Sequence, residues 1–403
     1  MRVLFINRFF HPDQSATSQL LTELAEDLDG LGVSVTIITG RVNYLGSGSL
    51  LPPRGTHKGI EIWRVRSSNF NRGRRLGRLA DYLSFYLAAG WAALCCKQHD
   101  CLVVLSDPPL LSVLAVIVGF LKRCKTVCWS QDVFPEIAVR AGVMSEGRLT
   151  RLLGRVAVWS LRRVDRTVVI GRCMERHLIE CNVPGSKLIR IPNWADGSHI
   201  QPVHRRENWF ADKHGLVDHF VVMYSGNFGV VHEFETILEM IRRGGSEDQI
   251  RFYFIGQGHH KEQLVEAAQC EGWGHVYFLP YQDREMMRFA LPAGDVHLVS
   301  LRSDMSGLSV PSKIYGVMAA GRPIIFIGPE DSEAAAVIRE AGCGYVIEPG
   351  RGIEATTAVF AYYRDRSLVE QHGQAARSYF DQHCDRRLAT GRFSRLVREI
   401  VAS

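Results

Sequence analysis

The sequence lacks the features that identify secreted, membrane-spanning or zinc-ribbon proteins. Its ten cysteines include no Cys-x-x-Cys pair, so a zinc site is not the favoured interpretation. The most apolar run, Leu110–Leu121, is shorter than the roughly 20 residues that cross a bilayer, and we interpret it as a buried crossover helix. The apolar start of the chain turns polar at His11 and lacks the pattern of a signal peptide. We therefore expect a cytoplasmic protein with reduced thiols and no bound metal.

Composition indicates a globular protein with more than one core. Hydrophobic residues make up 46% of the chain and charged residues 22%, which is unlike the composition of disordered proteins. A chain of 403 residues exceeds the usual size of one domain. We therefore expect two domains.

Positive charge is concentrated in the first half. Residues 1–200 carry a net charge of +10, although the whole chain carries +6. Two arginine clusters account for much of the excess, namely Arg72, Arg74, Arg75 and Arg78, then Arg148, Arg151, Arg155, Arg162, Arg163 and Arg166. They suit either a solvated face or an anionic partner such as a membrane surface. The stretch Arg72–Cys96 equally suits a helix at a membrane interface and an ordinary packed helix. No nucleic-acid recognition motif accompanies the arginines, so we expect no nucleic-acid partner.

Short apolar runs alternate with amphipathic stretches, which is typical of parallel sheets with crossover helices. The predicted strands of the first half are Arg2–Asn7, Val33–Thr39, Ile60–Arg66, Cys101–Leu105, Thr126–Trp129 and Arg166–Ile170. Those of the second half are Phe220–Ser225, Arg251–Ile255, His275–Leu279, Val296–Ser300, Pro323–Ile327 and Gly344–Ile347. The predicted helices are Leu20–Leu31, Glu233–Arg243, Lys261–Glu271 and Ser312–Ala320. The pattern predicts two sheets in series, divided within the polar stretch 191–217.

Loops that follow the strands of the first half hold its candidate binding residues, because ligands of open parallel sheets bind beyond the carboxyl ends of the strands. Small residues precede the first helix at Ser15, Ala16 and Thr17, where free amide groups suit an anion or an acceptor hydroxyl. Gln131, Asp132 and Glu136 follow another strand and suit sugar hydroxyls or proton transfer. The alternative for Asp132 is a helix cap.

The second half has glycines at two successive strand ends, Gly226 with Asn227 and then Gly256, which suit close approach of a ligand to the main chain. Its most specific stretch runs from Arg302 to Lys313 and feeds a helix. Lys313 and the helix start suit a diphosphate. The alternative for Lys313 is a surface lysine.

In these stretches the chain resembles the family-four glycosyltransferases over nearly its whole length. The motifs that carry the resemblance are FFHPDQSATSQLLTELAEDLDGLGVSVTIITG, SQDVFPE, IPNWAD, MYSGNFG and VPSKIYGVMAAGRPIIFIG. The resemblance implies the GT-B fold, in which two Rossmann-like α/β domains with parallel sheets face a central cleft. It also implies transfer of a sugar from a nucleotide donor with retention of anomeric configuration. The look-alikes build bacterial surface polysaccharides on lipid carriers.

By position, the resemblance implies that Gly226 and Asn227 begin the phosphate loop. It implies that Gly307, Leu308 and Ser309 form a donor-contacting loop. The segment Leu279–Gln282, with Tyr281, corresponds to the place where the nucleotide base is read, and Gln131 and Asp132 correspond to the region that contacts the transferred sugar.

The chain also departs from the family pattern. Leu308 and Gly316 occupy the places of two glutamates, and Asn227 and His232 those of a basic pair. We therefore predict that Lys313, Arg302 and the helix start at Ser312 balance the diphosphate charge. Lys313 would stabilise the leaving group, while Asp132 would orient the sugar or help the acceptor lose its proton.

The sequence thus predicts an N-terminal acceptor-binding domain at 1–195, a nucleotide-sugar-binding domain at 196–382 and a C-terminal helix at 383–403 that packs back on the first domain. The predicted activity is glycosyl transfer to a lipid-linked or glycan intermediate of surface polysaccharide synthesis, on the inner face of the membrane and with no required cofactor. Two alternatives remain at this point: a nucleotide-sugar epimerase of the same fold and a non-catalytic GT-B partner subunit.

Overall fold

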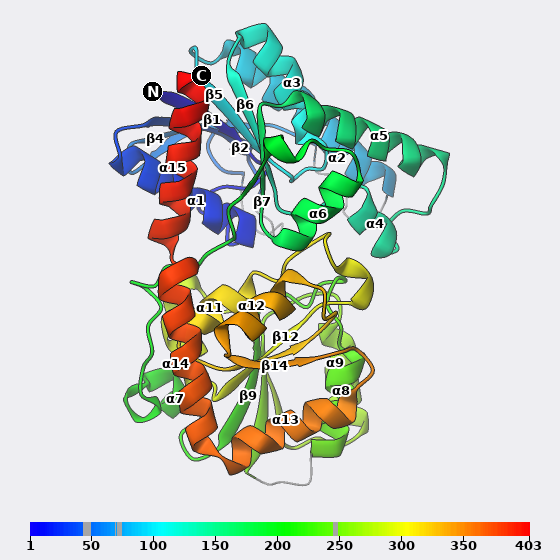
Figure 1. The fold of residues 1–403 in the computed structure, drawn as a ribbon, viewed down its shortest axis with the longest axis vertical. Helices are drawn as coiled ribbons and strands as arrows, with labels where there is room; N and C mark the ends of the chain where they lie inside the picture. Colours follow the sequence, from blue (N-terminus) through cyan, green and yellow to red (C-terminus); the bar gives the residue numbers. More distant parts are fainter. Residues whose placement is uncertain (43–49, 69, 71–74, 245–248) are drawn as a thin grey trace. The chain divides into compact units, whose positions relative to one another are not determined.

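The computed structural model describes residues 1–42, 50–68, 70, 75–244 and 249–403. The chain forms two compact units, each with its own sheet (Figure 1). The first unit comprises Met1–Pro192 and Ala389–Ser403, and the second comprises Asn193–Leu388. The chain therefore passes from one unit to the other twice, first at the start of the stretch predicted to divide the two sheets.

The sheet of the first unit has the strand order β3-β4-β2-β1-β5-β6-β7-β8. Its strands are β1 (Arg2–Ile6), β2 (Ser34–Gly40), β3 (Arg54–His57), β4 (Ile60–Val65), β5 (Cys101–Leu105), β6 (Lys125–Ser130), β7 (Arg166–Val169) and β8 (Leu188–Arg190). All neighbours pair in parallel except β3 and β4, which are antiparallel. The six predicted strands are confirmed. The two edge strands, β3 and β8, were missed because they are short and half-exposed.

The helices of the first unit include one at the apolar run Leu110–Leu121, which was predicted to be a crossover helix. They are α1 (Ala16–Gly30), α2 (Arg75–Cys95), α3 (Leu111–Lys122), α4 (Glu136–Arg140), α5 (Arg148–Arg163) and α6 (Arg172–Glu180), with a 3₁₀ turn η1 (Gly185–Lys187). The run predicted as a crossover helix is α3, which lies between β5 and β6. Among the described residues, no helix is both long and apolar enough to cross a membrane.

The sheet of the second unit is wholly parallel and has the order β11-β10-β9-β12-β13-β14. Its strands are β9 (Phe220–Ser225), β10 (Ile250–Ile255), β11 (Val276–Leu279), β12 (Val296–Ser300), β13 (Ile324–Ile327) and β14 (Gly344–Ile347). All six were predicted. Every residue of β9 is buried, because helices cover both faces of the sheet and its central strands are apolar on both sides. The strand order reverses between β9 and β12, which marks the switch point where ligands of such sheets bind.

The helices of the second unit connect these strands as expected of βαβ units. They are α7 (Trp209–Lys213), α8 (Glu235–Gly244), α9 (Lys261–Cys270), α10 (Arg284–Ala293), α11 (Lys313–Ala319), α12 (Glu333–Ala341), α13 (Gly352–Arg364) and α14 (Arg366–His383), with the 3₁₀ turns η2 (Arg205–Glu207) and η3 (Ser303–Met305). Helix α11 is only seven residues long and begins at Lys313, one residue later than predicted.

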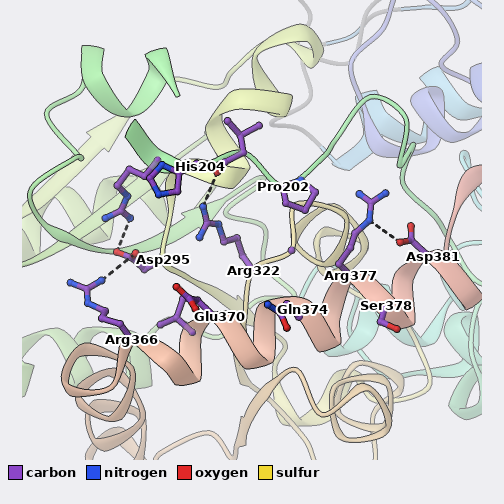
Figure 2. A pocket seen from close by; sticks show the side chains of 15 residues that line it. Pro202, His204, Asp295, Arg322, Arg366, Glu370, Gln374, Arg377, Ser378 and Asp381 are labelled. Atoms are coloured by element: carbon purple, nitrogen blue, oxygen red, sulfur yellow. Dashed lines mark hydrogen bonds and ion pairs between the residues drawn. The ribbon is translucent and has the colours of Figure 1, made fainter. Parts of the chain in front are cut away.

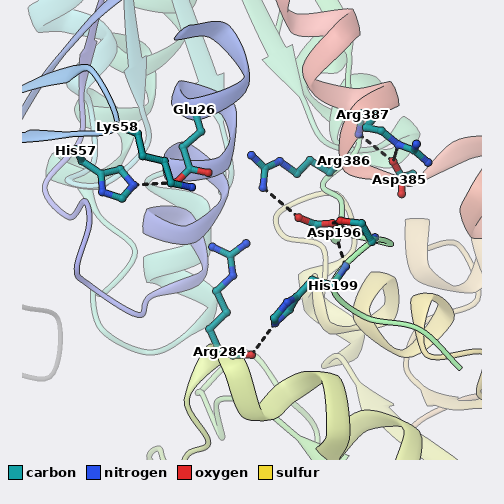
Figure 3. A network of polar contacts seen from close by, with 10 residues as sticks. Glu26, His57, Lys58, Asp196, His199, Arg284, Asp385, Arg386 and Arg387 are labelled. Carbon is teal, nitrogen blue, oxygen red and sulfur yellow. Dashed lines mark hydrogen bonds and ion pairs between the residues drawn. The ribbon is translucent and has the colours of Figure 1, made fainter. Parts of the chain in front are cut away.

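Helix α15 (Arg386–Ala402) contains the second crossing between the units. In the first unit its Phe393 ring lies 6.5 Å from the ring of Phe5 and 5.2 Å from that of Trp129, measured between centroids. At the other end of the helix, Arg386 forms an ion pair of 3.1 Å with Asp196 (Figure 3). This ion pair therefore links the segment through which the chain enters the second unit to the segment through which it leaves.

Candidate functional site

The loops after β9 and β10 in the second unit contact each other through their main chains. Gly226 and Gly256 have φ angles of +134° and +137°, which L side chains rarely adopt. A Cβ atom on Gly256 would lie 2.0 Å from the carbonyl oxygen of Gly226. Only glycine fits at this contact, and the two loops therefore present bare main chain at the switch point.

Asn227 is held in this arrangement by Tyr224, the second-last residue of β9. The hydroxyl of Tyr224 donates a hydrogen bond of 2.8 Å to the carbonyl oxygen of Asn227. A Cβ atom on Gly258 would lie 2.5 Å from the side-chain oxygen of Asn227 and 2.7 Å from the amide nitrogen of Phe228. Three glycines and one buried tyrosine thus fix the loop that the sequence resemblance assigns to phosphate binding.

Lys313 brings a positive charge to this loop. Its ammonium group donates to the hydroxyl of Tyr224 and lies 3.8 Å from the centroid of that ring. A Cβ atom on Gly226 would lie 3.4 Å from its Cε and 3.6 Å from its Nζ, so the ammonium group lies beside the glycine loop. Burial lowers the pKa of Lys313 well below its usual range. The alternative that Lys313 is a solvated surface lysine is therefore wrong.

His232 occupies the place of one of the two basic residues in the family pattern, but unlike Lys313 it does not bring a positive charge to the loop. Its side chain is buried and its Nδ1 donates a hydrogen bond of 2.7 Å to the carbonyl oxygen of Ser300, since that oxygen only accepts. Burial, and secondarily the ammonium of Lys313, lowers the pKa of His232 well below its usual range. The imidazole is therefore neutral at pH 7.

Arg302 differs from Lys313 because its charge is already compensated. Its guanidinium forms an ion pair of 2.9 Å with Asp304 and also donates to the carbonyl oxygen of Val230. A bound anion would have to compete with the Asp304 carboxylate. Lys313 is the better candidate of the two predicted cations.

The remaining predicted donor residues lie on either side of Lys313. Gly307 has a φ angle of +75° and begins the turn toward α11. The amide of Leu308 donates a hydrogen bond to the carbonyl oxygen of Met305. Its side chain is buried and belongs to the core. The side chain of Ser312 makes no capping hydrogen bond, and with a helix of only seven residues the predicted anion site at this helix start is weaker than the sequence indicated. Tyr281, after β11, is 38% exposed.

In the first unit, a serine that the sequence reasoning missed organises the loop after β6. The hydroxyl of Ser106 accepts hydrogen bonds from the amide groups of Gln131 and Asp132, at 3.0 and 3.3 Å. Ser106 and Asp132 also line a small cavity of about 40 Å³. Helix α4 begins at Glu136 and has Pro135 at its cap position. The alternative that Asp132 is a helix cap is therefore wrong.

The loop after β1 places further polar groups at the same end of this sheet. Asn7 is fully buried and its side-chain amide donates to the carbonyl oxygen of Phe9 at 2.6 Å. The hydroxyl of Ser15 is buried and has no hydrogen-bond partner among the described residues. Ala16 and Thr17 form the first turn of α1, whose amide groups have no acceptor within the helix. This end of the sheet therefore offers donors to a ligand.

Three supporting residues, Asn7, Ser106 and Tyr224, were not singled out from the sequence. Asn7 is the last residue of a predicted strand, Ser106 directly follows another, and Tyr224 is the second-last residue of a third. The same rule about strand ends that selected Gly226 would have found them.

A cavity of the second unit lies at the opposite, amino end of its strands. It has a volume of about 780 Å³ and is lined in part by residues that precede β12 and β13, namely Asp295 and Arg322. Arg366 pairs with Asp295 at 3.3 Å and Arg377 with Asp381 at 3.0 Å (Figure 2). These arginines are already paired, and the cavity is remote from the carboxyl ends where ligands of such sheets bind.

Comparisons with known proteins agree with this architecture. The model for the Glycosyl transferase 4-like domain matches residues 16–194, and that for Glycosyl transferases group 1 matches residues 219–365. The chain is 28% identical over 411 residues to the probable glycosyltransferase WbjE of Pseudomonas aeruginosa, covering 100% of this chain and 98% of that protein. It is 24% identical over 415 residues to WcaI of Escherichia coli (strain K12), whose name assigns it to colanic acid biosynthesis, with 99% and 100% covered.

A solved structure shares the fold at lower identity. Anabaena HepE, solved in complex with UDP-glucose, superposes with a TM-score of 0.76 and 14% identity, covering 99% of this chain and 100% of that one. The two-sheet architecture is the GT-B fold. Together, the two domain matches and the fold show that the chain belongs to the family-four glycosyltransferases.

Proposed function

We propose that this glycosyltransferase takes a sugar from a nucleoside-diphosphate sugar held by its second unit. The observation that carries the proposal is the ammonium of Lys313 beside Gly226, at the switch point of the second sheet. A diphosphate needs close approach to the main chain and a compensating charge, and this loop supplies both. The UDP-glucose in the HepE complex supports a donor of this class.

The transfer step follows from where charge develops. Loss of the nucleoside diphosphate builds negative charge on the leaving phosphate, while the sugar carbon becomes cation-like. The Lys313 ammonium, partly desolvated before the reaction, gains most when that negative charge forms, and this lowers the barrier. Asp132, in a loop held by Ser106, orients the sugar or takes the acceptor's proton. We propose retention of anomeric configuration, as the family resemblance implies.

The acceptor that we propose is a lipid-linked or glycan intermediate of surface polysaccharide synthesis, in keeping with the name of WcaI. Helix α3 packs against both α2 and α5. On these helices Leu87, Trp91 and Phe120 are 77%, 71% and 82% exposed. The arginines of α5 are exposed too: Arg148, Arg151, Arg155, Arg162 and Arg163. The first cluster lies largely outside the described residues, since Arg72 and Arg74 and the side chains of Arg75 and Arg78 are not described. Exposed apolar side chains on α2 and α3, together with exposed arginines on the neighbouring α5, suit an anionic membrane.

The donor proposal is tested by a thermal-shift screen against nucleoside diphosphates and their sugars. One nucleotide class should raise the melting temperature, because a ligand that binds only the folded state stabilises it. NMR of the product's anomeric proton then reports the stereochemistry. A new epimer from enzyme and donor alone would favour the epimerase, and donor binding without transfer until a second chain is added would favour the partner subunit. No shift with any nucleotide sugar would contradict the proposal.

The membrane proposal is tested by sedimentation with vesicles. The native protein should sediment with vesicles that contain anionic lipid, and the double variant Leu87→Glu/Phe120→Glu should stay in the supernatant. Ile353→Glu, at an exposed apolar position of the second unit, is the matched control. Equal sedimentation of the double variant and this control would contradict membrane docking through α2 and α3.

A further inference from the structure

Three side chains of the first unit with metal-binding chemistry lie close together. The ligand atoms of Glu136, His177 and Cys181 all lie within 4.8 Å of one another. Glu136 begins α4, whereas His177 is in α6 and Cys181 is the C-cap residue of that helix. His177 and Cys181 are four residues apart, so they share one face of the helix and both reach toward Glu136.

A second observation also indicates a ligand here. The Oε2 atom of Glu136 is buried and has no hydrogen-bond partner among the described residues. A buried carboxylate oxygen without a partner is costly, and native structures rarely leave one unsatisfied. A cation held by the neighbouring imidazole and thiol would satisfy it.

We propose that Glu136, His177 and Cys181 bind a zinc ion. Tetrahedral zinc with bonds of about 2.0–2.3 Å separates its ligand atoms by roughly 3.3–3.8 Å. The Sγ of Cys181 and the Nε2 of His177 lie 3.8 Å apart, which fits this spacing. All three ligand atoms lie within 4.8 Å of one another, so side-chain shifts of about 1 Å would bring them to the spacing that zinc requires.

The donor set selects the metal. Sulfur and imidazole favour zinc over magnesium or calcium, which take oxygen ligands. A thiolate and a carboxylate together carry two negative charges, which balance one Zn²⁺ ion at a partly buried place. Three protein ligands leave a fourth position for water or a ligand oxygen, as in zinc sites that are not closed.

The site shares no residue with the proposed phosphate loop, since all three residues belong to the first unit. The proposal differs from the expectation of no zinc site that was drawn from the missing Cys-x-x-Cys pairs. Glu136 was predicted to bind substrate, and we now assign it to the metal. The sequence did not indicate the site because Glu136 is 41 residues before His177 and only the packing of α4 near α6 brings them together.

Cobalt binding tests the proposal directly. The protein is freed of metal with a chelator under a non-thiol reductant and titrated with Co²⁺, whose thiolate ligation gives an intense near-ultraviolet charge-transfer band. The native protein and the control variants Cys95→Ser and Cys270→Ser, which remove exposed thiols, should show the band. Cys181→Ser should lose it.

Zinc affinity gives a second measurement, by competition with a chromophoric chelator. Cys181→Ser, His177→Gln and Glu136→Gln should each bind at least about tenfold more weakly, as expected when one ligand of a set is lost. Zinc should raise the melting temperature of the native protein and of the controls but not of Cys181→Ser. The absence of a thiolate band in the folded native protein would overturn the proposal. Native-like zinc affinity in all three ligand variants would overturn it too, and if one variant does not fold, the other two decide.

Discussion

The loops that follow the central strands are held in place differently in the two units. In the second unit, the loops after β9 and β10 meet through main chain, with Gly226 and Gly256 in conformations that favour glycine. In the first unit, the loop after β6 is held by the side chain of Ser106, and the loop after β1 contains the buried amide of Asn7. Bare main chain suits a diphosphate, whereas side-chain hydroxyls, amides and carboxylates suit the hydroxyl groups of a sugar or an acceptor. The same sheet architecture therefore presents two kinds of binding surface.

The largest effect should come from adding one methyl group to the glycine contact. Gly256→Ala places a Cβ 2.0 Å from the Gly226 carbonyl oxygen at a φ of +137°, which should cost about 3 kcal/mol or more in the free energy of unfolding. Gly272→Ala is the control, since its Cβ would meet nothing within 4 Å at a φ of +68°, and it should cost about 1 kcal/mol. Denaturant unfolding of both variants measures the difference. Equal losses of unfolding free energy in the two variants would contradict a close main-chain contact at Gly256.

Removal of the loop's positive charge should affect the reaction rather than the fold. Lys313→Ala should lower turnover at least about tenfold, or about 1.4 kcal/mol in barrier height, because the leaving phosphate loses its ammonium partner. Lys213→Ala, an exposed lysine of the same unit, should leave turnover unchanged. Transfer rates with a saturating donor, together with a melting curve, separate the two outcomes. An unchanged rate in folded Lys313→Ala would remove this residue from the site.

In the first unit, neutralising the carboxylate of Asp132 should affect transfer but not donor binding. Asp132→Asn should leave donor binding by calorimetry intact, because the donor is held by the other unit, while transfer falls roughly fivefold, about 1 kcal/mol. Glu146→Gln, an exposed residue of the first unit, should change neither quantity. Full transfer activity in Asp132→Asn would refute its assigned role.

The smallest effect should be a dependence of donor affinity on pH. Burial lowers the pKa of Lys313, and a bound diphosphate favours the ammonium form, so binding raises that pKa again. Affinity should therefore be highest below the lowered pKa and fall as the pH rises through it. Calorimetric titrations of the native protein and Lys313→Ala over a pH series isolate this contribution, because the variant lacks the group. Parallel pH profiles would contradict it.

Much of the fold was predictable, because the central strands are buried on both faces and their apolar runs stand out. Edge strand β3 escaped notice because Arg54–His57 is polar and pairs in an antiparallel hairpin. The positions of Gly226 and Lys313 were also predictable, since Gly226 directly follows a strand of the second sheet and Lys313 lies at a helix start fed by a glycine-containing loop. The cluster of Glu136, His177 and Cys181 was not, because only tertiary packing brings them together, and neither was the compensation of Arg302 by Asp304.

Helix α15 has a consequence for how the protein is made. Its later part belongs to the first unit, where Phe393 packs against Phe5 and Trp129, although these residues are separated by the entire second unit in the chain. Domains usually fold in the order in which the ribosome delivers them. Here the first unit includes Ala389–Ser403, which follow the second unit in the chain, so the second unit can reach its native state before the N-terminal core receives the helix that completes it.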